Sequence, residues 1–303
     1  MPRLLHTGQV IVDLTMALDA LPPAGGDVLA RSASLQAGGG FNVMASAQRN
    51  GLQTLYLGRH GKGRFADMVR EALSAEGIAL ALPLAPDKDT GICIALTEAN
   101  AERTFISFIG AEGGLSANEL AQVVVQPDDW VYVSGYSLLH PDKATCLLDW
   151  VSGLTPSVRV VFDPGPLIGS LEPALLGRLW PRVNLWSSNR REANSLPPAM
   201  ALKHLPADCQ IVVREGAQGC WIHHAQGQQC IPGFQVHALD TNGAGDAHMG
   251  ILLAVLSAGH SLAYAAQRAN AGAALAVTRW GPATAPWADE IDHFIEHARS
   301  YEP

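Results

Sequence analysis

Residues 240–259 read DTNGAGDAHMGILLAVLSAG, a glycine-rich turn that opens directly into an apolar helix. Small residues let the backbone turn so that the N–H groups of Gly243, Ala244, Gly245 and Asp246 converge beyond the helix N-terminus. This pattern predicts an anion site built from backbone. Asp246, at the same helix start, is placed to accept a proton from a hydroxyl that attacks a bound phosphate. The alternative is a tight turn in which Asp246 is only the N-cap.

Short apolar runs accompany this turn along the chain, and each ends near Gly, Asp or Asn. They lie at 4–14, 54–58, 131–135, 160–163, 183–188 and 210–215. Between them, amphipathic segments predict helices at 65–75, 143–153 and 247–258, and Gly259 follows the last of these as its C′ residue. Strands that alternate with helices in this way indicate an α/β fold with a parallel sheet.

Two stretches interrupt the alternation, at about 14–37 and about 90–110. The second, TGICIALTEANAERTFISFIG, predicts two alternating strands around Glu98–Glu102. Both stretches leave the α/β body and return to it. We therefore expect one continuous domain over residues 1–303 with a small β excursion outside the main sheet, rather than two linked domains.

The composition is that of a folded globular protein, since the 303 residues are 48% hydrophobic and 16% charged. The formal net charge of −8 provides no basic footprint for a nucleic acid, although it is compatible with a Mg-bound nucleotide. The five cysteines are scattered without a C-x-x-C pair, which argues against a disulfide framework or zinc ribbon and favours the reducing cytoplasm. With no signal peptide and no apolar run of about 20 residues, the sequence predicts a soluble protein without a membrane partner.

A second glycine-rich segment, AGGGFNVMASAQRNG, occupies residues 37–51. It places Gly38, Gly39 and Gly40 ahead of Asn42 and a helix, which permits a polar ligand to approach the backbone closely. Together with DTNGAGD, this segment resembles the two signature regions of the ribokinase and phosphofructokinase B family of carbohydrate kinases.

The resemblance extends over almost the whole chain. GQVIVDL matches the family's first strand and its substrate-binding aspartate at Asp13, SSNRREA carries the family's Asn-x-x-Glu at Asn189 and Glu192, and VVREGAQGCW aligns with the ATP loop. The segment at 269–281 resembles the one that flanks the adenine. The resemblance implies a ribokinase-like three-layer α/β/α sandwich with a mostly parallel central sheet, in which the two interrupting stretches form a small β-sheet lid.

The family transfers the γ-phosphate of ATP to a hydroxymethyl group of a small sugar or sugar derivative. On that basis Asp246 is the implied catalytic base, and the N–H groups of the turn bind the developing charge. The residues implied for this step are Asp246, Gly243, Ala244 and Gly245, and those implied for the sugar are Asp13, Gly38, Gly39 and Asn42. A carboxylate such as Asp13 is able to accept hydrogen bonds from two adjacent hydroxyls.

ATP and Mg²⁺ are the implied cofactors. The residues implied for the nucleotide are Asn189, Arg214, Gly216, Gly219, Gly245 and Asn270. Asn189 and Glu192 would organise Mg²⁺ through water, since magnesium keeps several of its waters; the alternative is a helix start exposed to solvent. For a monovalent cation, the family pattern points to Asp240, Asn242, Ala276, Arg279 and Gly281. Ala285 stands where some relatives add a hydroxyl ligand, so potassium dependence stays open.

The basic segment Arg59–Arg64 departs from the family pattern, which has an acidic pair there. One hypothesis is that it meets a phosphate already on the sugar, and the alternative is a solvated loop. The same segment satisfies a dinucleotide pattern, Gly61-x-Gly63-x-x-Ala66, which makes an NAD-binding protein the main alternative from another class. His248 replaces an aromatic residue of the family and is expected on the helix surface or on a pocket wall.

Other functions stay open. A nucleoside kinase would need an apolar or aromatic lid surface, for which Phe105 and Phe108 are candidates. A sugar-phosphate kinase and a non-catalytic sugar or nucleotide sensor are further alternatives. The resemblance also implies a homodimer through the lid, and the motifs do not specify the sugar.

Overall fold

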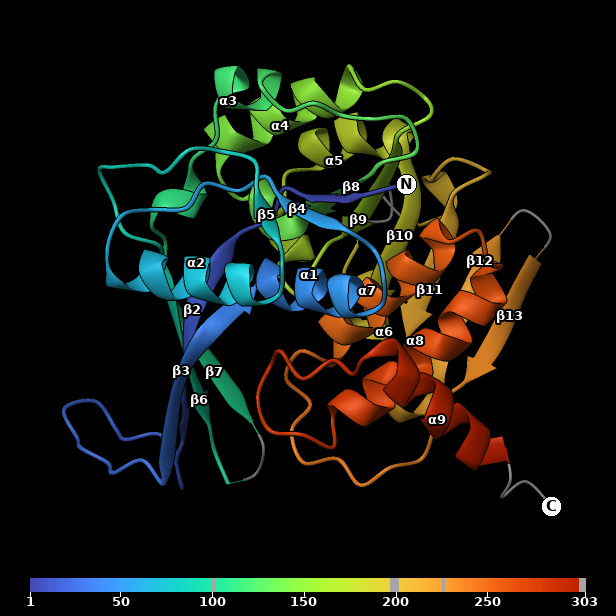
Figure 1. Ribbon diagram of the computed structural model, residues 1–303. Coiled ribbons are helices and arrows are strands. Elements are labelled where there is room, and N and C mark those ends of the chain that lie inside the picture. The colour runs from blue at the N-terminus through green and yellow to red at the C-terminus, as the bar shows by residue number, and fades with distance from the viewer. Residues whose placement is uncertain (100–101, 197–201, 225–226, 300–303) are drawn as a thin grey trace.

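The structure, a computed structural model, describes residues 1–99, 102–196, 202–224 and 227–299 (Figure 1). Its main feature is a nine-stranded sheet with the order β13-β12-β11-β10-β9-β8-β1-β4-β5. From β11 to β5 all neighbouring strands are parallel, whereas β12 and β13 form an antiparallel hairpin at one edge. The strands are β1 (Leu4–His6), β4 (Thr54–Tyr56), β5 (Ala79–Leu80), β8 (Trp130–Ser134), β9 (Arg159–Asp163), β10 (Val183–Asn189), β11 (Gln210–Arg214), β12 (Gly219–His224) and β13 (Gly227–Pro232). The predicted mostly parallel sheet is confirmed.

Helices cover both faces of this sheet, which is therefore the middle of three layers (Figure 1). Leu4 packs in the core on one face and the next residue, Leu5, in the core on the other, as expected for a strand buried on both sides. The Leu4 face is covered by α1 (Gly40–Arg49), α7 (Ala244–Ser257), α8 (Leu262–Ala276) and α9 (Ala288–Arg299), and the Leu5 face by α4 (Pro141–Ser152) and α5 (Pro173–Leu179). The predicted α/β/α sandwich is confirmed.

A second sheet of four strands has the order β3-β2-β6-β7 and projects from the body of the molecule (Figure 1). Its strands are β2 (Val10–Ala17), β3 (Ser32–Gly39), β6 (Ile92–Thr97) and β7 (Arg103–Phe108). The two interrupting stretches of the sequence therefore pair with each other through β2 and β6. Residues 100–101 of the predicted turn lie outside the described part of the chain.

The pattern of the apolar run at 4–14 suggested a single strand of the parallel sheet, but the run divides between the two sheets. Its first part, β1, pairs with β4 and β8 in the main sheet, while β2 begins at Val10 in the smaller sheet. Between them the chain passes Gly8, where a Cβ atom would lie 2.5 Å from His6 Cε1. An apolar run does not reveal which of two sheets it enters, because both sheets bury similar side chains.

Helix α7 lies in the centre of the molecule, between α1 and α8 (Figure 1). Every residue from Ala247 to Leu256 is buried, as expected for a helix that is apolar all round. The helix ends at Ser257, and Gly259 follows with a φ of +88°, so the predicted glycine stop is confirmed. No helix in the described ranges is long and apolar enough to cross a membrane.

Candidate active site

The two glycine-rich segments of the sequence meet at the start of α7. Gly243 is the N-cap of this helix with a left-handed φ of +74°, and Asp246 lies in its first turn. The alternative in which Asp246 is the N-cap is therefore wrong. Gly39 is the N-cap of α1, and Asn42 in that helix donates a hydrogen bond through Nδ2 to Asp246 Oδ2 at 3.0 Å. One implied sugar-binding residue thus holds the implied catalytic carboxylate.

Asp246 has the electrostatics of a base that titrates near neutrality. Burial raises the pKa of its carboxyl to about 7, and the charges of Asp163 and Asp13 add to this rise. The hydrogen bond from Asn42 and the guanidinium of Arg214 oppose it. A general base is most effective when its pKa lies near the working pH. The site therefore combines a proton acceptor with the N–H groups of a helix start.

Asp13 of β2 contacts Gly38 on the neighbouring strand β3. A Cβ atom at position 38 would lie 1.9 Å from Asp13 Oδ2, so only glycine leaves room for this carboxylate. Burial raises the pKa of Asp13 to about 6. Asp13 pairs in register with Gln36 and Cys93, so these side chains share one face of the smaller sheet.

The predicted Asn-x-x-Glu pair closes the start of α6 (Arg190–Asn194). Asn189 Oδ1 accepts from the Glu192 N–H at 2.8 Å, and Glu192 Oε2 accepts from the Asn189 N–H at 2.7 Å. Glu192 is 7% exposed, and burial and the charge of Asp163 raise the pKa of its carboxyl. The alternative of a solvent-exposed helix start is therefore wrong for Glu192.

Arg214, at the end of β11, joins the carboxylates of this region. Its guanidinium contacts Asp163 Oδ2 at 3.2 Å and Glu192 Oε2 at 3.7 Å, and it donates to Ser187 Oγ at 2.7 Å. A Cβ atom at position 245 would lie 3.5 Å from Nη2, so the guanidinium lies against the start of α7. The motifs pointed to Arg214 but missed Asp163. The sequence did contain a signal for Asp163: it is the last residue of a parallel strand, and ligands bind at the carboxyl ends of such strands.

The other residues implied for the nucleotide lie around the edge hairpin and α8. Gly216 and Gly219 flank the turn between β11 and β12. Asn270 of α8 donates through Nδ2 to two carbonyls at the end of β13, at 3.0 and 3.1 Å, so its Oδ1 is the acceptor that faces His248 Nε2 at 3.2 Å. His248 is 3% exposed, and its expected position on the helix surface is wrong. Burial and the charge of Arg214 lower the pKa of its imidazole to about 3, so this side chain is neutral.

The five residues implied for a monovalent cation lie on the loop before α7, at the end of α8 and on the loop after α8. Asp240 Oδ1 accepts from the Asn242 N–H at 2.9 Å, and Oδ2 accepts from the Gly281 N–H at 3.1 Å. Ala276 ends α8, and its carbonyl accepts from the Arg279 N–H at 3.1 Å. The loop after α8 is thereby tied to the turn before α7.

Arg59 of the basic segment is paired internally, whereas Lys62 and Arg64 are exposed. Arg59 donates to the two carboxylate oxygens of Glu119 at 2.7 and 2.6 Å. The helix that follows, α2 (Arg64–Ala75), has its first N–H groups capped by Asp89, which accepts from Phe65 and Ala66 at 3.1 and 2.8 Å. A dinucleotide would place its pyrophosphate where this carboxylate lies. The structure thus gives the NAD-binding alternative no support.

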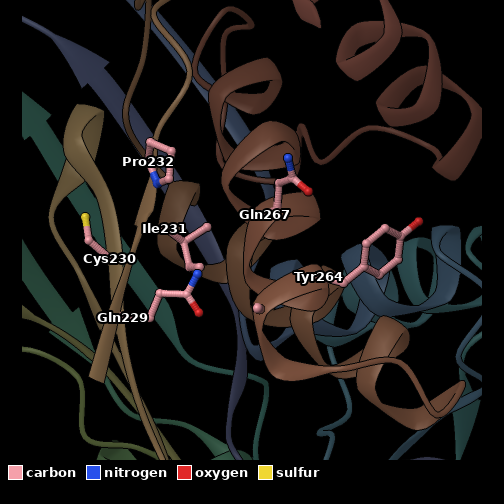
Figure 2. A pocket seen from close by; sticks show the side chains of 7 residues that line it. Gln229, Cys230, Ile231, Pro232, Tyr264 and Gln267 are labelled. Carbon is pink, nitrogen blue, oxygen red and sulfur yellow. The ribbon is translucent and has the colours of Figure 1, made fainter. Parts of the chain in front are cut away.

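A pocket of about 350 Å³ lies elsewhere, between the edge strand β13 and helix α8 (Figure 2). Its lining residues are Gln229, Cys230, Ile231, Pro232, Ala263, Tyr264 and Gln267. None of them was predicted as a site residue, and none is charged. The titratable groups described above, rather than this groove, mark the candidate active site.

Comparison with known proteins agrees with this geometry. The family model for pfkB family carbohydrate kinases matches residues 1–289. The chain is 34% identical to a protein named uncharacterized sugar kinase YegV, of Escherichia coli (strain K12), over 94% of this chain and 91% of the relative. It is 27% identical to the ATP-dependent ribose-1-phosphate kinase of Halopiger xanaduensis over 97% of this chain and 98% of the relative. A solved structure of a protein designated ribokinase II from E. coli, in complex with ATP and Mg²⁺, has the same fold, with a TM-score of 0.82 at 23% identity over 98% of this chain and 100% of that chain. The chain belongs to the pfkB family of carbohydrate kinases, which are phosphotransferases with an alcohol group as acceptor.

Proposed function

We propose that this enzyme transfers the γ-phosphate of ATP to a hydroxymethyl group of a small sugar or sugar derivative, with Asp246 as the general base. The observation that carries the proposal is the Asn42–Asp246 hydrogen bond of 3.0 Å at the start of α7. It supports the proposal because the carboxylate held by Asn42 lies in the first turn of a helix whose N–H groups suit a phosphate. Family membership argues against the alternative of a non-catalytic sensor.

In this mechanism each group of the site has one task. Asp13 and the backbone of Gly38 and Gly39 hold the acceptor, and Asp246 takes the proton of its hydroxyl as the oxygen attacks. The N–H groups from Gly243 to Asp246 meet the charge that develops on the transferred phosphoryl group. Arg214, which lies against the same helix start, adds a fixed positive charge.

The residues present fit a magnesium nucleotide. Arg214 contacts the carboxylates of Asp163 and Glu192, and the charge of Asp163 raises the pKa of both Glu192 and Asp246. Within the described ranges, no cluster of three His, Cys, Asp or Glu side chains is able to hold a metal ion. Magnesium is commonly bound by few protein oxygens and by substrate phosphates, and it neutralises phosphate charge when bound. Glu192 and Asn189 would hold it through water.

Glu192→Gln is expected to raise the Mg²⁺ concentration needed for half-maximal activity by about tenfold, because a residue that orients metal-bound water loses its charge. The measurement is a Mg²⁺ titration at fixed ATP. Glu296→Gln, on the exposed side of α9, is the matched control. An unchanged titration in Glu192→Gln would remove Glu192 from the metal site.

Gly38→Ala is expected to raise the KM for the acceptor by about a hundredfold, because the displacement of a substrate-positioning group by about 1 Å has an effect of this size. The new Cβ atom would lie 1.9 Å from Asp13 Oδ2 and must displace that carboxylate. Gly177→Ala in α5 is the control, since a Cβ atom there meets no atom within 4 Å. The KM for ATP should not change. Equal KM values for the acceptor in the two variants would contradict the assignment of Asp13.

The pH profile of kcat/KM is expected to fall on the acid side with an apparent pKa near 7, because Asp246 must be ionised to accept a proton. Asn42→Leu removes the hydrogen bond that lowers this pKa. The acid limb should therefore move to higher pH, whereas Asn118→Leu, at an exposed position of α3 (Ala117–Ala121), should leave it in place. If the acid limb does not move in Asn42→Leu, the hydrogen bond from Asn42 does not set the pKa of the catalytic base, and the assignment of Asp246 as the base that Asn42 holds is contradicted.

The acceptor is best identified by measuring Mg-ATP consumption over a panel of pentoses, hexoses, sugar acids, nucleosides and phosphorylated sugars. The proposed function expects turnover with a free sugar or sugar derivative. Phosphorylated sugars belong in the panel because one relative is named a ribose-1-phosphate kinase, but Arg59 of the basic segment is already paired with Glu119. Turnover with NAD-linked substrates and none with ATP would overturn the proposal.

A nucleoside kinase is the second candidate, and the position of Phe105 in the smaller sheet is the observation that favours it. Phe105 pairs with Ala95, which pairs with Thr15, so it shares the face of the smaller sheet on which Asp13 lies. Phe108 pairs with Ile92 and belongs to the opposite face. If the acceptor is a nucleoside, Phe105 is the residue for its base to stack on.

The smaller sheet is also the place where we expect two copies of the chain to meet, with the sheet closing over the acceptor as a lid. Its edge strand β7 exposes Phe105, Ile106 and Phe108 by 56%, 57% and 71%. An apolar edge strand is a template for pairing with another chain. A dimer in sedimentation experiments, and a monomer for Ile106→Lys, would support this assembly; a wild-type monomer would oppose it.

A further inference from the structure

The loop after α8, residues 277–285, lies directly against the anion-binding turn. A Cβ atom at Gly243 would lie 1.9 Å from Pro282 O, so this carbonyl borders the N-cap of α7. A Cβ atom at Gly281 would lie 3.2 Å from Gln36 Nε2 on the smaller sheet. Any shift of the loop therefore reaches both the anion site and the sheet that carries Asp13.

Thr284 ties this loop together from within. Its hydroxyl donates to Ala276 O at 3.0 Å, with Gly281 O at 3.3 Å as a second acceptor. These are two of the carbonyls that the family pattern implies as ligands of a monovalent cation. Ala276 O also accepts from the Arg279 N–H at 3.1 Å, so both of its lone pairs are engaged.

The loop also carries a positive charge of its own. Arg279 donates through Nη1 to Thr284 O at 3.4 Å, while Nη2 pairs with Glu290. A cation coordinated by Ala276 O and Gly281 O would have to break the Thr284 hydroxyl bonds and lie near this guanidinium. The carbonyl set therefore does not fit a cation while the hydroxyl donates to it.

We propose that Thr284 is a positioning residue whose hydroxyl replaces the monovalent cation of the family pattern, so that this enzyme needs no potassium. The hydroxyl holds the Ala276 and Gly281 carbonyls together and thereby keeps Pro282 against the N-cap of α7. In the sequence, Ala285 indicated that a hydroxyl was missing. The structure supplies one from the residue before it.

The test compares thermal midpoints and kcat in potassium chloride and in tetramethylammonium chloride at equal ionic strength. For the wild type, kcat in the two salts should differ by less than about twofold, and the thermal midpoint should be the same in both. An ion that has no binding site on the folded protein does not stabilise it over the unfolded chain. Thr284→Val keeps the shape but removes the donor. In tetramethylammonium its midpoint should fall by about 2 °C, as expected for buried carbonyls that lose a hydrogen bond.

Potassium should then restore both the midpoint and kcat of Thr284→Val, since the freed carbonyls become available to a cation. Thr284→Ser retains the hydroxyl and should lose the potassium response again. Thr278→Val is the matched control, because the Thr278 hydroxyl donates to Leu275 O at 2.7 Å, outside the implied ligand set. Its midpoint should fall without a potassium response.

Two results would overturn the proposal. One is a wild type whose kcat potassium raises by about tenfold or more, which is the size of effect that a specific effector has. The carbonyls would then be open to the ion. The other is a Thr284→Val variant that equals the wild type in tetramethylammonium, because the hydroxyl would then not brace the loop. The activity measurement rests on the proposed function, whereas the thermal measurement does not, so the two ideas can fail separately.

Discussion

Asp246→Asn is expected to lower kcat by about a thousandfold while ATP binding is retained, because it removes the proton acceptor but little else. Asparagine has almost the same shape, and its Oδ1 is still able to accept from Asn42 Nδ2, which lies 3.0 Å from the carboxylate. Turnover and calorimetric ATP binding should be measured on the same preparation. Asp149→Asn, in an exposed ion pair with Arg178, is the control.

The same variant has a second, independent signature in its stability. Burial raises the pKa of Asp246 from 3.8 to about 7, so the folded protein is destabilised when this group ionises. Asp246→Asn should therefore have a higher thermal midpoint than the wild type above pH 7. The gain should fade as the pH falls below 7 and vanish below 3.8, where the carboxyl is protonated in both states. Near-normal turnover, or a lower midpoint at high pH, would contradict the role and environment given to Asp246.

Arg214→Met is expected to have the largest effect on stability, about 3–5 kcal/mol, because it leaves buried carboxylates without their partner. The side chains of Arg214, Asp163 and Glu192 are 13%, 13% and 9% exposed, so water cannot replace the guanidinium. kcat/KM should also fall by about a hundredfold, since a fixed positive charge beside the start of α7 is lost. The measurements are denaturant unfolding and steady-state kinetics.

A second variant separates these two effects. Arg214→Met combined with Asp163→Asn should recover part of the stability, because one unpaired charge is removed, but it should recover no activity. Arg178→Met breaks an exposed pair with Asp149 and should cost no more than about 1 kcal/mol. If Arg214→Met unfolds no more easily than Arg178→Met, the buried ion pairs do not hold this region together.

The parts of the site that were predictable are contiguous in the chain. The turn at Gly243 and the helix after it depend on small residues, an apolar stretch and the stop at Gly259, all of which are local. The Asn189 and Glu192 pair is local as well, since a residue and its third successor meet at a helix start. For such features, residue type and spacing carry the geometry.

The parts that were not predictable join residues far apart in the chain. The run at 4–14 divides between two sheets because Gly8 lets the chain turn, and its apolar pattern is the same in either case. His248 was expected on the helix surface or on a pocket wall, but it is buried, and Asn270 on another helix is its partner. Asp163 gains its importance from Arg214, which is two strands away in the sheet. Strand order and register decide such contacts.

The local chemistry of the chain was thus enough to specify an α/β fold with a parallel sheet, a glycine-rich turn that opens into an apolar helix, and an aspartate at the start of that helix. Steric limits at glycine and the periodicity of apolar residues act over a few positions and need no partner. The pKa of Asp246, the charge balance around Arg214 and the Thr284 bridge arise only in the folded molecule. They depend on burial and on distances of about 3 Å between groups from different elements, and such distances exist only after the sheets and helices have packed.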